Sequence, residues 1–249
     1  MIPQIDLNCD LGEGAGQDAV LMPLISSANI ACGAHAGDEA TMRAIVALAK
    51  GCRVSVGAHP GYEDRENFGR TKMALEPREV FELVVRQLSA LNRITDEAGV
   101  AMTHVKPHGA LYNRSARDAV TARAIAEAVR AVSPALVLYG LAGSESIRAG
   151  QAVGLHVANE VFADRLYRSD GLLVPRSQPG AVHTTEEAMI AQVIAMVERG
   201  TVQAQDGCLV AVQADTLCLH GDGPHAVSFA KTIRKVLSDI GVQIRPCVA

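Results

Sequence analysis

The feature that most constrains the fold is the regular alternation of short apolar runs with longer segments of helical period. Seven runs have the length and composition of strands, and they span 5–10, 28–34, 53–59, 102–108, 136–141, 155–161 and 216–222. Between them lie amphipathic segments such as 80–94, where apolar residues recur every three or four positions. This alternation is typical of βα units. We therefore expect an α/β protein built on a parallel sheet.

Two of the predicted strands, 5–10 and 102–108, alternate polar with apolar residues. Side chains along a strand alternate between its faces, so the polar residues of each strand share one face. A charged face inside an α/β fold is costly unless it lines a polar cavity. We therefore predict a closed (β/α)7 TIM-like barrel with a polar lumen, rather than an open doubly wound sheet. The polar residues are Asp6, Asn8, Asp10, His104, Lys106 and His108.

Histidine and aspartate recur where the predicted strands end. The similar phrases CGAHAGD (32–38) and VGAHPGY (56–62) each place a histidine, His35 or His59, before a glycine-containing turn. In α/β barrels the carboxyl ends of the strands meet at one mouth, which holds the active site. We therefore expect five of the seven strands to deliver acidic or imidazole side chains to one mouth. The other strand ends are Asp10, His108 and the pair His220 and Asp222.

Composition excludes several classes of protein. Hydrophobic residues make up 49% of the chain and aromatic residues only 3%, so the core must be built from aliphatic side chains. The net charge of −4 and the lack of a basic run argue against nucleic-acid binding. No apolar stretch approaches the ~20 residues of a membrane span. The N-terminus lacks an export signal and the six cysteines are scattered, so we expect a cytoplasmic protein with reduced thiols.

No linker of Pro, Ser and Gly divides the chain, so we predict a single domain over residues 1–249. Two connections, 61–76 and 163–180, are long. The length of the second predicts a functional loop or lid. Segment 201–214 places Asp-Gly between two alternating runs, which predicts a β-hairpin inserted before the last strand.

Long motifs along the chain resemble those of the LamB/YcsF family, which supplies the A component of prokaryotic ATP-dependent 5-oxoprolinase. They read DLNCDLGEG, NIACGAHAGD, VGAHPGYEDRENFGR, HVKPHGALYN, NEVFADRLY, LVPRSQPGAV and CLHGDGPHAV, in the family's order, between residues 6 and 227. The resemblance implies a barrel of the glycoside hydrolase/deacetylase type. It implies a hydrolase of a cyclic amide that acts with partner subunits B and C. Together they would open the lactam of 5-oxo-L-proline to L-glutamate while ATP becomes ADP and phosphate.

Lactam opening requires a base for water and a group that stabilises an anionic oxygen. Asp10 and Asp222 are the candidate bases, and Lys106 is the candidate charge stabiliser. Each has a structural alternative. Lys106 could pair with Asp6 or Asp10 in the lumen, and Asp222 could cap the helix that begins near residue 224.

Substrate binding is expected from polar groups at the same mouth. Arg70 and Arg176, in or beside the two long loops, match a carboxylate or a phosphate in bidentate fashion, and so does Arg165. Glu160 and Asp164 could accept the lactam N–H, although helix capping or an ion pair with Arg165 is the alternative. The full set of expected substrate-binding residues is Asn8, His35, His59, His108, Glu160, Arg70 and Arg176.

The sequence is compatible with a metal ion and with ATP as cofactors, but it requires neither. His35, His59 and His108, with Asp10, could hold a divalent metal, but neutral histidines bonded to a substrate carboxylate explain the same residues. The chain contains neither G-x-x-x-x-G-K-[ST] nor G-x-G-x-x-G. ATP would therefore bind by another route at the mouth or on a partner protein.

Two other functions remain open. One is a metal-dependent deacetylase or amidohydrolase that acts on an acylated sugar or amide without ATP. The other is a non-catalytic scaffold whose partners carry out the chemistry. Metal analysis of protein purified without chelators tests the first. Barrel-mouth substitutions that abolish activity while leaving assembly with the partners intact would argue against the second.

Overall fold

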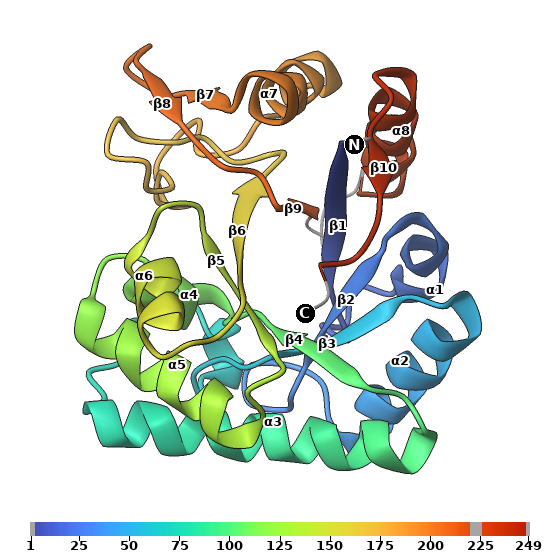
Figure 1. Ribbon diagram of the computed structural model, residues 1–249, viewed down its shortest axis with the longest axis vertical. Helices are drawn as coiled ribbons and strands as arrows, with labels where there is room; N and C mark the ends of the chain where they lie inside the picture. The colour runs from blue at the N-terminus through green and yellow to red at the C-terminus, as the bar shows by residue number, and fades with distance from the viewer. Residues whose placement is uncertain (1–2, 220–225, 248–249) are drawn as a thin grey trace.

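Seven parallel strands close into a barrel in a computed structural model that describes residues 3–219 and 226–247 (Figure 1). The strand order is β1-β2-β3-β4-β5-β6-β9, and β9 also pairs with β1, which closes the barrel. The predicted α/β barrel is therefore confirmed. The strands are β1 (Gln4–Leu11), β2 (Ser27–Ala31), β3 (Ser55–His59), β4 (Met102–Val105), β5 (Val137–Leu141), β6 (Val157–Phe162) and β9 (Thr216–Leu219).

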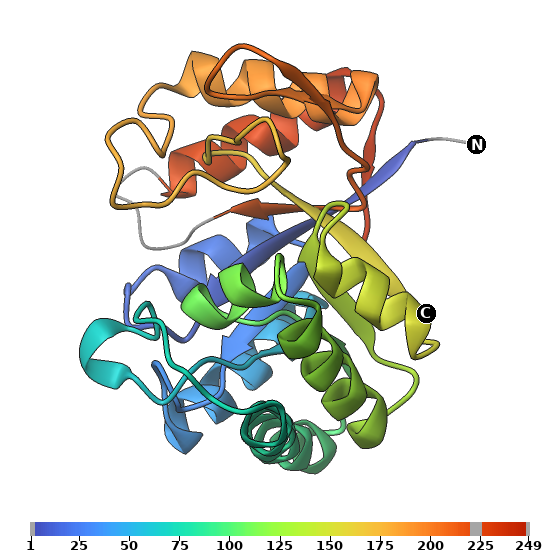
Figure 2. The same cartoon turned by 90° about the vertical axis from the view of Figure 1, so that its left-hand side faces the viewer.

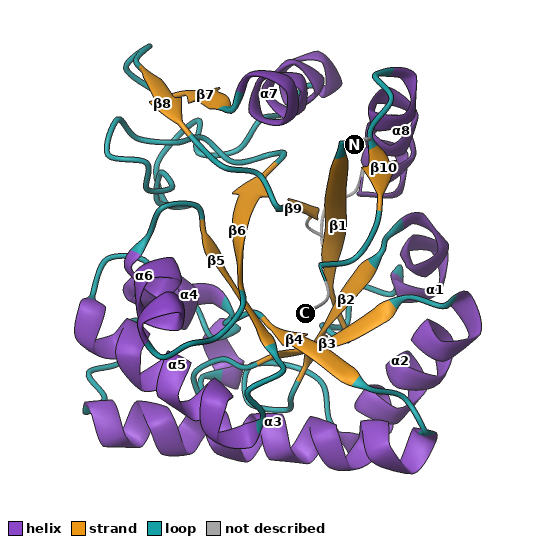
Figure 3. Cartoon of the chain, in the orientation of Figure 1, coloured by secondary structure: helices purple, strands orange, loops and turns teal. Residues whose placement is uncertain are grey.

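Helices surround the strands, as the purple and orange ribbons of Figure 3 show. They bury their apolar stripes against the outer face of the barrel, which is lined by the aliphatic residues of the strands. The helices are α1 (Asp18–Leu21), α2 (Glu39–Cys52), α3 (Pro77–Ala98), α4 (Gly109–Ser115), α5 (Ala119–Val132), α6 (Glu145–Ala152), α7 (Glu186–Arg199) and α8 (Ala226–Asp239), with 3-10 turns η1 (Met22–Leu24) and η2 (Arg65–Asn67).

The long helix α3 shows how local sequence sets these elements. Pro77 occupies its first turn, where the helix has no use for the missing N–H. Glu76 and Glu79 form a capping box that satisfies backbone donors at this end. Gly99 ends the helix in the left-handed conformation, with φ 64°. Between these signals the apolar residues face the barrel, as the periodicity predicts.

Two additions lie outside the barrel. The hairpin β7 (Thr201–Gln203) and β8 (Leu209–Ala211) pairs antiparallel, which confirms the hairpin expected from Asp-Gly. β10 (Gln243–Ile244) pairs parallel with the start of β1. Figure 2 shows α7 and α8 together on the opposite side of the barrel from α2, α3 and α5. No helix in the described part of the chain is long and apolar enough to cross a bilayer.

Two predicted strands end earlier in the structure than expected. β2 ends at Ala31, so His35 lies in the following loop rather than at the strand end. β4 ends at Val105, but backbone bonds from Lys106 N to Ala58 O and from His108 N to Pro60 O, at 2.9 and 2.8 Å, continue the pairing with the β3 segment. Because the alternation persists past β4, both side chains still face the lumen. The seventh strand is described only as far as Leu219.

Candidate functional site

The amino end of the lumen holds a layer of polar side chains that satisfy one another. Asp6 accepts hydrogen bonds from the hydroxyls of Ser26 (2.6 Å), Ser27 (2.7 Å), Thr216 (2.6 Å) and Tyr139 (3.0 Å). Burial raises the pKa of Asp6, and these four hydroxyls lower it only in part. We call Asp6, Ser26, Ser27, Tyr139 and Thr216 the basal layer. It has the character of a structural network.

Above the basal layer lie two asparagines and a histidine. Asn29 donates to Asn8 at 2.8 Å, and His104 Nε2 lies 2.9 Å from Asn29 Oδ1. A Cβ added to Gly57 would lie 2.2 Å from the His104 ring, so only glycine fits beside it in the phrase VGAH. Burial, and then Lys106, lower the pKa of His104 to about 3, so this imidazole stays neutral.

Lys106 is the centre of the next layer and is 2% exposed. Its Nζ lies 2.9 Å from Asp10 Oδ1 and 2.9 Å from Glu160 Oε1. It also contacts Asn8 Oδ1 at 3.2 Å and Cys218 Sγ at 3.0 Å. Burial alone would lower the pKa of Lys106, but Asp10, Cys218 and Glu160 raise it well above the usual value, so the ammonium is retained. The lumen ion pair thus forms with Asp10 and Glu160, and Asp6 takes no part in it.

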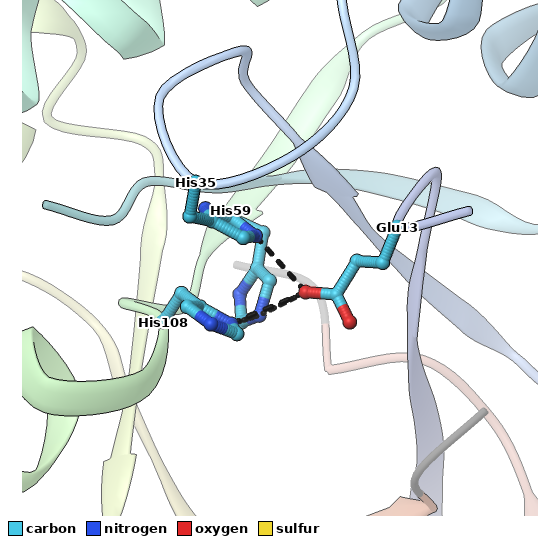
Figure 4. Close-up of side chains that lie close together, drawn as sticks. All are labelled: Glu13, His35, His59 and His108. Carbon is cyan, nitrogen blue, oxygen red and sulfur yellow. Dashed lines mark hydrogen bonds and ion pairs between the residues drawn. The ribbon is translucent and has the colours of Figure 1, made fainter. Parts of the chain in front are cut away.

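Four side chains converge at the carboxyl end of the barrel, and Figure 4 shows them around one carboxylate oxygen. Glu13 Oε1 lies 2.9 Å from His35 Nε2, 3.2 Å from His108 Nδ1 and 3.6 Å from His59 Nε2. The four ligand atoms all lie within 4.8 Å of one another, which suits a metal ion. We call Glu13, His35, His59 and His108 the mouth cluster.

Glycines make room for this cluster. Gly69 has φ +63°, and a Cβ there would lie 2.8 Å from His35 Cβ and 3.0 Å from the His108 ring. A Cβ on Gly61 would lie 2.7 Å from His35 Nδ1. The glycines of HPGY and FGR are therefore explained by the packing of His35 on His108, whose rings stack at 3.7 Å.

The pKa values of the four residues in the mouth cluster do not all shift in the same direction. Burial would raise the pKa of Glu13, but its close contacts with the rings of His108 and His35 lower it overall. Burial lowers the pKa of His35 to about 4 and also lowers that of His108. Burial would lower the pKa of His59 as well, but the charge of Asp10, 3.4 Å away, raises it overall. Glu13 is therefore a carboxylate at neutral pH.

A cavity of about 450 Å³ opens above Lys106 at the mouth. Asp10, Glu13, His59 and His108 line its polar floor. The segment 163–180 forms much of its wall, which supports the expectation of a functional loop there. The rest of the described lining combines apolar side chains with six cationic ones, which are Arg70, Lys72, Arg117, Arg165, Arg168 and Arg176.

Arg165 is the most buried of these arginines. Its Nε lies 3.4 Å from Ala181 O and its Nη2 2.5 Å from Val174 O, so it ties the loop 163–180 together. Burial, and then Arg176, lower the pKa of Arg165 to about 10, which still leaves it charged at neutral pH. Arg70 lies over the ring of Phe68, 4.9 Å from its centroid.

The structure brings most of the expected site residues together. The lumen or its mouth holds Asn8, Asp10, His35, His59, Lys106, His108 and Glu160, and the cavity wall holds Arg70 and Arg176. Asn8 and Glu160 contact Lys106, and Asn8 Nδ2 also donates to Glu160 at 3.0 Å. Asp222, with His220 and His225, lies outside the described residues.

Sequence reasoning missed Glu13, the residue on which the histidines converge. It lies three residues beyond Asp10, between Gly12 and Gly14, both of which have positive φ. The signal was available in DLGEG, because an acidic residue in a glycine-rich turn after a strand lies at the barrel mouth. Cys218, beside Lys106, was also missed, because an apolar run conceals a cysteine that faces the lumen.

These features define a class of protein. It is an α/β barrel of seven parallel strands, with a polar lumen and a cluster of three histidines and a glutamate at its mouth. A mutant of the peptidoglycan deacetylase PdaC from Bacillus subtilis shares the fold, with a TM-score of 0.50 and 12% identity, covering 98% of this chain and 87% of that chain.

The family model of LamB/YcsF matches residues 5–249, and the chain therefore belongs to the LamB/YcsF family. The crystal structure of the lactam utilization protein from Thermus thermophilus is closely similar. Its TM-score is 0.90 and its sequence identity 45%, and the match covers 97% of this chain and 99% of that chain. The family expected from the sequence motifs is thus confirmed.

Proposed function

We propose that this protein is the A component of an ATP-dependent 5-oxoprolinase, which opens the lactam of 5-oxo-L-proline to L-glutamate. The observation that carries the proposal is the position of the Lys106–Asp10 pair on the floor of a cavity whose wall is rich in arginine. A base and a cation lie where a small anionic amide can reach both. Similarity to a lactam utilization protein supports the choice of a cyclic amide.

The chemistry assigns a role to each part of the cavity. Transfer of the γ-phosphoryl group of ATP to the lactam oxygen would release ADP and make the ring carbon electrophilic. Water then adds to that carbon as Asp10 accepts its proton, and Lys106 stabilises the negative charge on oxygen. Breakage of the C–N bond, with protonation of nitrogen, gives an acyl phosphate. A second water hydrolyses it to L-glutamate and phosphate.

The arginines account for the charge of the substrate. The substrate carboxylate and the transferred phosphoryl group are both anionic, and guanidinium groups bind such oxygens in bidentate fashion. Arg70 and Arg176 lie on the cavity wall at the rim. Glu160, 2.9 Å from Lys106 Nζ, shares the ammonium with Asp10 and holds it in place in this proposal, and Asp10 acts as the base.

Partner subunits B and C complete the proposal, because the sequence carries no standard nucleotide-binding motif. ATP would bind in the complex rather than on this chain alone. The experiment compares glutamate release from 5-oxoproline and ATP by the purified chain with release by the chain together with subunits B and C. We expect turnover only with the subunits. Robust ATP-dependent turnover by the single chain would contradict this division of labour.

A second function, that of a metal-dependent deacetylase or amidohydrolase that needs no ATP, has its own support in the mouth cluster. A bound metal ion can activate water directly. The same assay separates the two functions. Chelator-sensitive hydrolysis of an acylated sugar or simple amide without ATP would favour the second function. Strict dependence on ATP would favour the first.

A further inference from the structure

The hydrogen-bond partners of two histidines fix the positions of their protons. His59 Nδ1 lies 2.7 Å from the carbonyl oxygen of Lys106, and His108 Nε2 lies 2.8 Å from that of Phe68. A carbonyl oxygen only accepts hydrogen bonds, so both of these ring nitrogens carry the hydrogen. In the neutral tautomers, His59 Nε2 and His108 Nδ1 then present lone pairs.

Those lone pairs face each other and a carboxylate. His59 Nε2 and His108 Nδ1 lie 3.0 Å apart, and Glu13 Oε1 lies 3.6 and 3.2 Å from them. With both imidazoles neutral, three acceptors thus meet in a buried place with no hydrogen between His59 and His108, and Asp10 Oδ2 lies 3.4 Å from His59 Nε2 as well. Such an arrangement is unfavourable unless a cation lies among the acceptors.

We propose that the mouth cluster binds a single divalent transition-metal ion, best suited to zinc, through Glu13 Oε1, His59 Nε2, His108 Nδ1 and His35 Nε2. Tetrahedral zinc holds its nitrogen and oxygen ligands at about 2.0–2.1 Å, which places neighbouring ligand atoms about 3.3 Å apart. Four of the six distances between these atoms are 2.9, 3.0, 3.2 and 3.6 Å, and all the ligand atoms lie within 4.8 Å of one another.

The second ring nitrogens fit the same assignment. Histidines that bind a metal usually donate their other N–H to a carbonyl or carboxylate, which fixes the ring. His59 and His108 do so through the carbonyls of Lys106 and Phe68. His35 Nδ1 is buried and has no such partner among the described residues. His35 also stacks on His108 and must tilt away to bind the ion, so it is the weakest of the four ligands.

The donor set selects the class of ion. Magnesium and calcium prefer oxygen ligands, whereas three imidazoles and one carboxylate suit zinc and its neighbours in the first transition row. Glu13, His59 and His108 all line the cavity that holds Lys106 and Asp10. The ion would therefore border the place where substrate binds. Binding of the ion does not depend on ATP, a lactam or partner subunits, so it stands or falls separately from the proposed function.

The test measures zinc binding to the purified chain. Protein stripped with a chelator is titrated with Zn²⁺ by calorimetry, dialysed and analysed for metal by mass spectrometry. We expect one ion per chain, and X-ray absorption should show nitrogen and oxygen ligands at about 2.0–2.2 Å. Failure of the wild-type chain to bind zinc, manganese or cobalt at this stoichiometry would overturn the proposal, and a proton would then be the cation among the acceptors.

Variants locate the ion. Glu13→Gln, His59→Gln and His108→Gln should each weaken zinc binding by at least about a hundredfold, and His35→Gln by less. His104→Gln is the matched control, because it is a buried lumen histidine whose two nitrogens already contact Thr103 and Asn29. Circular dichroism verifies that each variant is folded. Unchanged zinc affinity in the folded Glu13→Gln variant, or equal loss in His104→Gln, would overturn the assignment.

Discussion

The barrel lumen contains two buried polar regions that differ in how completely their groups are paired. In the basal layer Asp6 accepts four hydroxyl hydrogen bonds, at 2.6 to 3.0 Å. In the mouth cluster, acceptors of Glu13, His59 and His108 face one another, and all three line a cavity of about 450 Å³. The basal layer therefore satisfies its own acceptors and does not line the cavity. The mouth cluster does not satisfy its own acceptors, and it opens to the cavity.

This difference shows which buried polar groups point to function. Burying a polar residue is costly anywhere, so both regions need compensation. In the basal layer, hydrogen bonds among its own residues compensate for the cost of burial, as they do in a structural network. The mouth cluster lacks hydrogen bonds that satisfy all of its acceptors, so a cation from outside the cluster must compensate for their burial. The Lys106 layer lies between them, since it is internally paired with Asp10 and Glu160 yet borders the cavity.

The largest effect is expected for Lys106→Met, which tests whether the middle layer is structural as well as catalytic. Removing the ammonium leaves Asp10 and Glu160 buried without their cation, which costs roughly 3–5 kcal/mol of unfolding free energy. Turnover of the reconstituted complex should fall by about a hundredfold or more. Chemical denaturation and glutamate release measure the two effects. A variant as stable as the wild type would show that the carboxylates need no partner.

Asp10→Asn is expected to separate the two roles of that layer. The amide keeps the shape of the side chain, and Lys106 retains Glu160 as its partner, so the loss of unfolding free energy should be smaller than for Lys106→Met. Loss of the base should nevertheless lower turnover by about a hundredfold or more. The same denaturation and glutamate-release measurements check both expectations.

The combined Asp10→Asn, Lys106→Met variant provides the control for this pair. If the two residues formed only a structural ion pair, removing both would restore the turnover that the single variants lose through an unpaired Asp10 or Lys106, although Glu160 would still lack its cation. We expect turnover to remain lost in the double variant. Recovery would show that the catalytic assignment of Asp10 is wrong.

The smallest effect on turnover is expected in the basal layer, for Tyr139→Phe. The change deletes one hydrogen bond to Asp6, at 3.0 Å, and keeps the ring that stacks on His104. Unfolding free energy should fall by about 1–3 kcal/mol, because the bond is made to an acidic group. Turnover should be unchanged within error. A tenfold loss of turnover in a folded variant would remove the distinction between the two regions.

Much of the fold could be predicted from the sequence, because its signals are local. Period-two and period-3.6 patterns specify strands and helices, and Pro77 and Gly99 mark the ends of α3. Asp-Gly specified the hairpin β7–β8. The shared polar face of His104, Lys106 and His108 follows from strand alternation and holds past the end of β4. Strand bounds were less accurate, since Ala31 ends β2 earlier than expected.

The sequence by itself determined the parallel strands, the polar lumen and the set of histidines that reach the mouth, because each depends on residue spacing along one element. Tertiary structure alone decided which groups meet across the barrel. It pairs Lys106 with Glu160, 54 positions along the chain, and brings Glu13 to three histidines from three other segments. Such contacts depend on barrel closure and on the register between strands, and neither is encoded in the spacing within any one segment.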